Sequence, residues 1–465
     1  MTGIHHSIRL ARALPLALAT VFLFDLPPGL DAQQPAPAAI GSPVHLTLPA
    51  AIDMAIAHNH KLELARLSVH DSEEQKRIAQ SHFYPVIKNE SATLHITALE
   101  GVVIPAGAFS HGTSIGSIPA ETLHIDQGAS TTYTSGTGLD QPLTQMFKIR
   151  AGVKAADADL QTAKIQASDA ENAIALAVHQ LYYGYLIEQL NGSTAEDAVK
   201  ASTVSEEENQ KGVQEGRLLT DVELGSRADL LDKQRAVLIS KLNMDDLTLQ
   251  LDNVLGLPLG TKLALDADAL GDLPILPSRS EAVQKVLEKS PAVLTAKQTI
   301  EKAKAGVSAA RDAYIPNITG MARYSYQSGL PFFQHNFGTF GATFTYDFFD
   351  GGAREASLRD ARIKLTMAET QLAQIENDVQ VEISAAYDKV EQLQELVKVS
   401  QLMLETREES YRIHTQRADV NAELASGVAE AHAATTAAKR NVLSSRLNLY
   451  LAQDDIKRLL GDTPR

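Results

Sequence analysis

The chain contains 465 residues, carries a formal net charge of −15 and has no cysteine. An acidic balance without a basic block argues against nucleic acid as a partner. The lack of cysteine excludes a disulfide framework, thiol chemistry and a lipidated N-terminal cysteine. The length would ordinarily correspond to about three globular domains, but an internal repeat indicates one elongated unit instead.

The first 32 residues have the pattern of a secretory signal. Arg9 and Arg12 precede an apolar run over residues 13–26, and Ala32 closes a candidate cleavage site. The alternative is the disordered tail of a cytosolic protein. Residues 33–43 are rich in proline and alanine and are predicted to form a tether. No other stretch approaches about 18 consecutive apolar residues, so the sequence predicts no transmembrane helix.

A long helix is predicted from residue 147 to residue 211. Apolar or small residues recur there in steps of four and three, which is the repeat of a supercoiled helix. These positions are Ile149, Val153, Ala156, Leu160, Ala163, Ala167, Ala170, Ile174, Ala177 and Leu181. At the rise of an α-helix the segment is on the order of 100 Å long.

The pattern occurs twice in the chain. A gapless shift of 205 residues finds it again over Leu358–Val379 and pairs residues 235–243 with 440–448, where six of nine residues are identical. Upstream the shift becomes 231 residues and pairs Pro85 with Pro316, so the first copy contains 26 additional residues. Two unrelated heptad patterns would not share these identities at a fixed shift. The chain is therefore predicted to be an internal duplication.

Each copy is predicted to consist of helix, strand, strand, helix and helix. The boundaries are residues 44–258 for the first repeat, 259–279 for an equatorial linker, 280–461 for the second repeat and 462–465 for a C-terminal tail. Helical patterns over 48–82 and 218–255 together match the length of the long helix. We therefore expect two shorter helices, stacked end to end, to run antiparallel beside each long one.

Four segments change to the alternating pattern of β-strands. They are predicted at about residues 86–99 and 130–142 in the first repeat and about 317–327 and 339–348 in the second. In the second repeat one face is apolar, with Tyr324, Phe340 and Phe344, and the other is polar. Strands of a transmembrane barrel have this pattern, whereas a strand pair in a soluble sheet is the alternative. Residues 100–129 are predicted to form a long outward-facing loop.

With these features the chain resembles the TolC-like outer-membrane efflux protein family over about residues 44–461. The carrying motifs are the helix–strand junctions at Pro85 and Pro316, the strand–helix junctions Gln141-Pro142-Leu143 and Phe348-Phe349-Asp350-Gly351-Gly352, and the turn from Gly216 to Thr220-Asp221-Val222. The resemblance implies a mainly α fold with membrane β-structure. A coiled-coil helical barrel would continue a β-barrel of about 12 strands, four from each of three protomers.

The resemblance also implies a homotrimer in the cell outer membrane, in contact with its lipid and extending into the periplasm. A periplasmic adaptor and an inner-membrane transporter are the implied partners. The pattern of the residues agrees, because four strands alone would leave edges that lipid does not tolerate.

The two helical turns at the inner end of such a tunnel are the implied functional sites. In the family these turns touch the adaptor, and acidic residues near the second turn help to form a constricted, cation-binding entrance. The adaptor-contact candidates are Gly216, Arg217, Leu218 and Leu219, and the gate and cation candidates are Asp221, Asp419, Glu423 and Glu430. Threefold repetition would concentrate carboxylates in a ring and attract cations. Ordinary solvated charges at the tips are the alternative, and the second turn, residues 421–427, carries no clear family motif.

The predicted function is an exit duct for small molecules, driven by an inner-membrane pump through the adaptor. The alternatives are the outer-membrane component of type I protein secretion and a periplasmic coiled-coil scaffold without a pore. No nucleophile-elbow or glycine-loop motif indicates an enzyme, and we expect no cofactor or metal site. His58 and His60 are expected at the surface. The sequence does not indicate whether the cargo is a drug, a metal ion or a protein.

Overall fold

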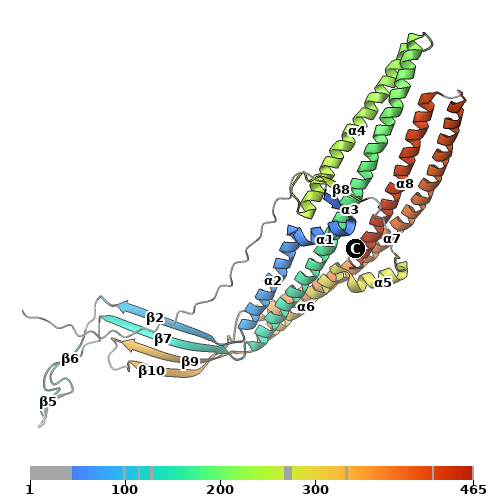
Figure 1. The fold of residues 1–465 in the computed structure, drawn as a ribbon. Coiled ribbons are helices and arrows are strands. Elements are labelled where there is room, and N and C mark those ends of the chain that lie inside the picture. The colour runs from blue at the N-terminus through green and yellow to red at the C-terminus, as the bar shows by residue number, and fades with distance from the viewer. Residues whose placement is uncertain are drawn as a thin grey trace, which may run out of the picture. The chain divides into compact units, whose positions relative to one another are not determined.

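The computed structural model describes residues 44–97, 101–113, 116–125, 130–266, 275–329, 334–420 and 424–462, all within the unit Ser42–Arg465. The predicted signal and tether, residues 1–32 and 33–43, lie outside these ranges, as do residues 463–465 of the predicted tail. Helices make up most of the described chain (Figure 1).

Two long helices, α3 (Met146–Gln214, 69 residues) and α7 (Ala353–Asp419, 67 residues), form the framework. None of the ten predicted repeat positions from Ile149 to Leu181 is exposed, because neighbouring helices cover them. The chain returns along each long helix as α4 (Thr220–Leu255) and α8 (Ala425–Leu459). Among the described helices, none has an apolar stretch long enough to cross a membrane.

The shorter helical segment of each repeat is divided into two helices. The sequence predicted a continuous helix over 48–82 and, through the duplication, an equivalent helix at the start of the second repeat. The structure instead has α1 (Leu48–His58) with α2 (His60–Ser81), and α5 (Arg279–Lys289) with α6 (Pro291–Asp312). The breaks fall at Asn59 and Ser290, which the 231-residue shift makes equivalent. Asn59 accepts a hydrogen bond from the Lys61 amide and so caps α2, while Pro291 starts α6 at a position where its missing N–H costs nothing.

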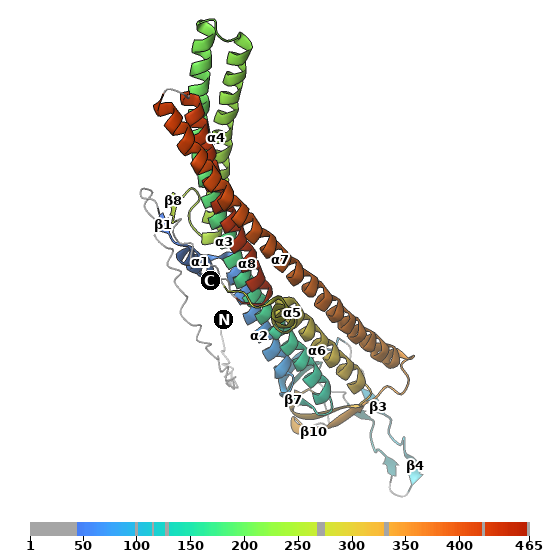
Figure 2. The same cartoon turned by 90° about the vertical axis from the view of Figure 1, so that its right-hand side faces the viewer.

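The helices lie side by side along α3 and α7, in two halves that follow one another along the long axis. Near the helical turns α3 contacts α4 and α8, and α8 contacts α7. Nearer the strands α3 contacts α2 and α6, and α6 contacts α7 (Figures 1 and 2). The lateral order is therefore α4–α3–α8–α7 in one half and α2–α3–α6–α7 in the other. In the described chain, α4 and α2 form one lateral edge and α7 forms the other.

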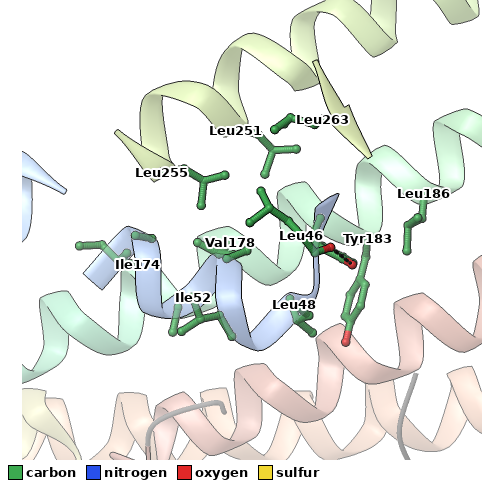
Figure 3. Close-up of a cluster of buried hydrophobic side chains, with 14 of the residues drawn as sticks. Leu46, Leu48, Ile52, Ile174, Val178, Tyr183, Leu186, Leu251, Leu255 and Leu263 are labelled. Atoms are coloured by element: carbon green, nitrogen blue, oxygen red, sulfur yellow. Dashed lines mark hydrogen bonds between the residues drawn. The ribbon is translucent and has the colours of Figure 1, made fainter. Parts of the chain in front are cut away.

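A buried hydrophobic cluster lies where α1 meets the middle of α3 (Figure 3). Ile52, Val178 and Leu251, from α1, α3 and α4, are almost fully buried in it. Strand β1 (Val44–Leu46) pairs in parallel with β8 (Leu263–Leu265) beside the cluster. Since β8 lies within residues 259–279, the segment predicted as a linker includes a short strand. The second repeat has an equivalent cluster of buried α5, α7 and α8 side chains.

Four antiparallel strands form a sheet at one end of the helices, in the order β10-β9-β7-β2. They are β2 (Val86–His95), β7 (Thr131–Pro142), β9 (Asn317–Ser328) and β10 (Asn336–Thr345). Each repeat supplies one strand pair, and β7 joins β9 across the repeats. The sheet does not close on itself, so β2 and β10 are its two edges.

The segment between β2 and β7, predicted as a loop, contains short strands in its described part. β3 (Val102–Ile104) pairs with β6 (Leu123–Ile125), and β4 (Ser110–Thr113) pairs with β5 (Gly116–Ile118). The additional residues of the first repeat therefore form a narrow antiparallel extension beyond the sheet.

Candidate functional site

The turn between α3 and α4 is a glycine-terminated helix end. Gly216 adopts a φ of +72°, and the amides of Gly216 and Arg217 donate to the carbonyls of Val213 and Gly212 at 3.0 and 2.8 Å. This is the Schellman arrangement, which satisfies the last carbonyls of a helix. Glycine is required at this position because a side chain disfavours positive φ.

The four adaptor-contact candidates differ in what their side chains do. Leu218 packs against Gly212, where an added Cβ would lie 2.6 Å from Leu218 Cδ1. Arg217 forms an ion pair with Glu215. Leu219 is 74% exposed, whereas Leu218 is 38% exposed. Leu219 is therefore the apolar side chain that the turn presents to solvent, and Leu218 is partly used to build the turn.

Asp221 lies in the first turn of α4, next to that leucine pair. Its carboxylate accepts a hydrogen bond from the Val222 amide at 3.0 Å, and Glu223 is in the same helical turn. Acidic side chains at a helix N-terminus are stabilised by the helix dipole. Asp221 thus has a structural role in addition to any contribution to a gate.

The second turn lies between α7 and α8. Asp419 is the last residue of α7, and Glu430 lies on α8; both are exposed. Glu423 lies outside the described residues. Val420 and Leu424 are strongly exposed, so this turn also presents apolar side chains.

A contact between the repeats, which the sequence did not predict, holds the start of α8. Glu208 of α3 accepts a hydrogen bond from the Ser426 amide at 3.3 Å. Lower on the same helices, Asp197 accepts hydrogen bonds from Lys200 at 2.9 Å and from Thr436 of α8 at 3.1 Å. The Lys200 hydrogen bond, then the Thr436 hydrogen bond and electrostatic interactions with Lys200 and the nearby His432, lower the pKa of Asp197. The sequence did not indicate that Glu208 and Asp197 contact α8, because these contacts depend on how α8 packs beside α3.

A hollow of about 460 Å³ lies beneath the second turn, between α3, α7 and α8. Asp197, Lys200, Tyr411 and His432 line its polar side, and the Tyr411 and His432 rings are 5.3 Å apart. Within the described ranges, no group of three or more His, Cys, Asp or Glu side chains is arranged to hold a metal ion.

One buried ionisable pair lies away from the turns, in the middle of the helices. His179 Nδ1 of α3 is 2.5 Å from Asp454 Oδ2 of α8, and Lys457 donates to the same carboxylate at 3.2 Å. Both members of the pair are less than a tenth exposed. The contact joins the two repeats at the level of the hydrophobic clusters.

Arg354 stabilises the junction between β10 and α7. Its guanidinium donates to Asp350 at 2.8 Å and lies over the ring of Tyr346, 5.0 Å from the centroid. Phe348 and Phe349 are each 88% exposed at this junction. Exposed aromatic side chains at the end of a strand are typical of the boundary between lipid and water.

Both lateral edges of the helical layer expose apolar residues at heptad-like spacing. On α4 these are Leu224, Leu231, Leu238, Leu242 and Leu249, and on the adjacent half of α7 they are Leu396, Val399, Leu402, Met403 and Ile413. Such rows are the core positions of a coiled coil, yet no described helix covers them. Large exposed apolar patches mark sites of association.

Comparison with known proteins identifies the family. The outer membrane efflux protein family matches residues 51–257 and 282–462, which is most of the chain. This chain belongs to the outer membrane efflux protein family. The family match covers both repeats and confirms the resemblance inferred from their junctions.

Individual efflux proteins match along most of their length. The antibiotic efflux pump outer membrane protein ArpC and the toluene efflux pump outer membrane protein TtgC, both of Pseudomonas putida, are 22% identical over 429 residues, which cover 88% of this chain and 82% of each relative. The outer membrane protein VceC of Vibrio cholerae has a TM-score of 0.69 at 16% identity, covering 89% of this chain and 96% of VceC. The MtrE channel of Neisseria gonorrhoeae in its open state has a TM-score of 0.70 at 18% identity, covering 90% and 91%.

These likenesses confirm the predicted fold class, a mainly helical channel fold with a β domain. Membership of the efflux family places the protein in the outer membrane, from which it extends into the periplasm. The family and its structural neighbours are channels rather than enzymes.

Proposed function

We propose that three copies of this outer membrane efflux protein close into a channel-tunnel, which serves as a passive exit duct for small molecules. An inner-membrane transporter would drive the transport through a periplasmic adaptor bound at the helical turns. The observation that carries the proposal is the pair of unsatisfied lateral edges.

In the described part of the chain, neither lateral edge is covered by another helix or strand, either along the helices or along the sheet. One edge consists of β2, α2 and α4, and the other consists of β10 and α7. Since the two edges differ, pairing one edge with the same edge of another copy across a twofold axis would leave the other edge open. A head-to-tail contact, in which one edge of each copy meets the opposite edge of the next, closes into a ring. Three copies of a four-stranded sheet would make a barrel of about 12 strands, within the range of outer-membrane barrels.

The helical edges support the same closure. The leucine row of α4 and the Leu396–Ile413 row of α7 lie in the same half of the molecule and have compatible spacing. Packing one row against the other across copies would bury both, which removes the main reason for a single copy to aggregate. The relatives named for antibiotic and toluene efflux favour small molecules as cargo over secreted protein.

Cysteine cross-linking tests the ring, because the native chain has no cysteine to compete. One cysteine would replace Leu238 on α4, and a second would be scanned from Leu396 to Ile413 on α7. Oxidation of the detergent-purified protein should give covalent dimers and trimers at a few scan positions, and native mass spectrometry should show three copies. Leu238→Cys alone should remain monomeric on a denaturing gel. A soluble monomer that needs no detergent would contradict the proposal and favour the scaffold alternative.

Cross-linking in intact cells tests the partners. A photoactivatable cross-linker attached at Leu219→Cys samples the exposed side of the first turn without removing the Leu218–Gly212 packing. Recovery of an adaptor together with a proton-driven pump supports small-molecule efflux. Recovery of an ATP-driven exporter would instead favour type I protein secretion. The matched control attaches the cross-linker at Leu64→Cys on α2, far from the turns.

A further inference from the structure

The strand register divides the sheet into two chemically different faces. Directly paired residues of neighbouring strands point to the same face. One face, which we call the aromatic face, carries Ile87, Tyr133, Leu139, Ile318, Tyr324, Tyr326, Phe340 and Phe344. The opposite face, which we call the ionic face, carries every Asp, Glu, Lys and Arg of β2, β7, β9 and β10, namely Lys88, Glu90, Asp140 and Arg323.

This division assigns the ionic face to the lumen of the proposed barrel. A Lys or Arg on the lipid face is strongly destabilising at the middle of the bilayer, whereas a lumenal position is in contact with water. Glu90 and Arg323 lie near the middle of β2 and β9, where that destabilisation would be greatest. The aromatic face carries none of the Asp, Glu, Lys or Arg residues of the four strands and includes Phe340, which is 90% exposed, as expected of a face that contacts lipid.

Arg323 reaches across an entire strand to form an ion pair. Its Nη1 lies 3.2 Å from Glu90 Oε2, although β7 separates β9 from β2. The strand between them offers Gly136 at the crossing point. A Cβ on Gly136 would lie 2.5 Å from Arg323 Nε, whereas one on Gly138 would have no neighbour nearer than Arg323 Cγ, at 3.8 Å. The guanidinium therefore lies against the backbone of β7, in a space that exists because residue 136 has no side chain.

We propose that Glu90 and Gly136 hold Arg323 flat against the lumenal wall and that this ion pair sets the charge selectivity of the barrel. The inference rests on the proposed function, because the ionic face becomes a lumen only when copies close the sheet. Three Arg323–Glu90 pairs would then lie at one level of the barrel, with positive and negative charges in equal number. Loss of Glu90 would free Arg323 to extend into the lumen and make it anion-attracting, while loss of Arg323 would leave three carboxylates and make it cation-attracting.

Charged thiol reagents measure the lumenal potential directly and do not depend on whether the periplasmic end is open. The reporter is Ser325→Cys, which lies on the ionic face directly opposite Gly136. Ser135→Cys is the matched control, because Ser135 pairs with Tyr326 and so lies on the aromatic face of the neighbouring strand. Cationic and anionic methanethiosulfonates would be added outside vesicles that contain the full-length protein, and the ratio of their reaction rates would be recorded.

The proposal predicts opposite changes for the two charges. Arg323→Gln should raise the cationic-to-anionic rate ratio at Ser325→Cys, and Glu90→Gln should lower it, each by about tenfold, since a nearby unit charge affects the two reagents in opposite directions by about threefold. The double variant should return close to the parent ratio. Gly136→Ala should lower the ratio by displacing Arg323 from the wall, whereas Gly138→Ala and Asp360→Asn, a charge-removing control on α7, should not change it.

The outcomes separate this inference from the proposed function. One outcome would overturn the inference alone. In it, the protein forms a trimer and Ser325→Cys reacts while Ser135→Cys does not, but the ratio of reaction rates is the same with and without the Arg323 and Glu90 substitutions. Faster labelling of Ser135→Cys than of Ser325→Cys in the trimer would reverse the assignment of the faces and also overturn it. Equal labelling of both cysteines in a protein that does not form trimers would overturn the closed barrel and the inference together.

Discussion

Tyr182 and Tyr387 make the same hydrogen bond in the two repeats. The Tyr182 hydroxyl donates to the Leu46 carbonyl at 3.0 Å, and the Tyr387 hydroxyl donates to the Pro277 carbonyl at 2.8 Å. The two tyrosines are related by the 205-residue shift and the two carbonyls by the 231-residue shift. Each tyrosine thus anchors, to a long helix, the segment that leads into the first short helix of its repeat. The two bonds persist across a duplication in which most side chains have diverged.

Removing these hydroxyls should destabilise the protein unequally. Tyr182 is 1% exposed and also accepts a hydrogen bond from the Asp266 amide at 3.0 Å. We expect Tyr182→Phe to cost about 2–3 kcal/mol and Tyr387→Phe about 1 kcal/mol, because more buried partners lose a hydrogen bond in the first case. Thermal unfolding in detergent, followed by circular dichroism, measures the difference. Tyr185→Phe is the control, since its hydroxyl is 3.4 Å from the Leu263 carbonyl and should matter least; equal midpoints for all three variants would contradict the prediction.

Replacing glycine by alanine should destabilise the turn between α3 and α4 at Gly216 but not at Gly225 in α4. Gly216 has a φ of +72°, so Gly216→Ala should cost about 1–2 kcal/mol locally. Gly225 lies within α4, where an added Cβ meets nothing within 4 Å, so Gly225→Ala should be neutral or stabilising by up to about 1 kcal/mol. Hydrogen exchange of the Arg217 and Leu218 amides reports the effect. Exchange should accelerate in Gly216→Ala only; unchanged protection there would show that the turn does not depend on the glycine.

Acid should weaken the contact between α3 and α8 at Asp197. Because hydrogen bonds lower the pKa of this carboxyl below its ordinary value of 3.8, its stabilisation is present above about pH 4. That stabilisation is lost as the pH falls through the lowered pKa. Asp197→Asn should therefore be less stable than the native chain at pH 7, by less than about 1 kcal/mol since the side chain is partly exposed. The two should converge toward pH 3.

A pH series of thermal midpoints tests this convergence. Asp360→Asn, which removes an exposed carboxylate paired with Lys364 on α7, should give a curve parallel to that of the native chain. A constant difference between Asp197→Asn and the native chain from pH 7 to pH 3 would exclude Asp197 as the titrating group.

Acidic residues of the second turn should determine the cation preference of the periplasmic entrance. In a ring of three copies, Asp419→Asn combined with Glu423→Gln removes six carboxylates from a small region. We expect the potassium-to-chloride permeability ratio to fall by about threefold or more, since a potential change of about one kT alters local ion concentration by that factor. Planar-bilayer recordings measure the ratio, with Glu63→Gln, which removes one carboxylate per copy on α2, as a control away from the turns. Currents identical to those of the native channel would remove these residues from the gate.

Local patterns that recur along the chain were enough to predict most of the helices and strands from the sequence alone. The four-and-three spacing from Ile149 to Leu181 predicted α3, and the same pattern from Leu358 predicted α7, because a long helix repeats its requirement for apolar positions many times. Period-two alternation predicted the strands that flank α3 and α7 for the same reason. The duplication and the junctions at Pro85 and Pro316 then indicated the family, which the family match confirms.

Single local interruptions were harder to predict, although a signal existed. The breaks at Asn59 and Ser290 each depend on one capping side chain or one proline, and an apolar repeat continues across them. Ser290-Pro291 is an N-cap residue followed by a proline at the first helical position, which is a recognised helix start. The apolar spacing nevertheless predicted one continuous helix, because it extends over dozens of residues whereas the helix-start signal consists of two.

Only the tertiary structure decided which distant residues meet. The Arg323–Glu90 pair requires the registers of three strands and a glycine at one crossing point. The contact of Glu208 with Ser426 requires α8 to lie beside α3 rather than beside α7 alone. Spacing along one element fixes which face a residue occupies, whereas contacts between elements depend on their relative register, which no local pattern contains.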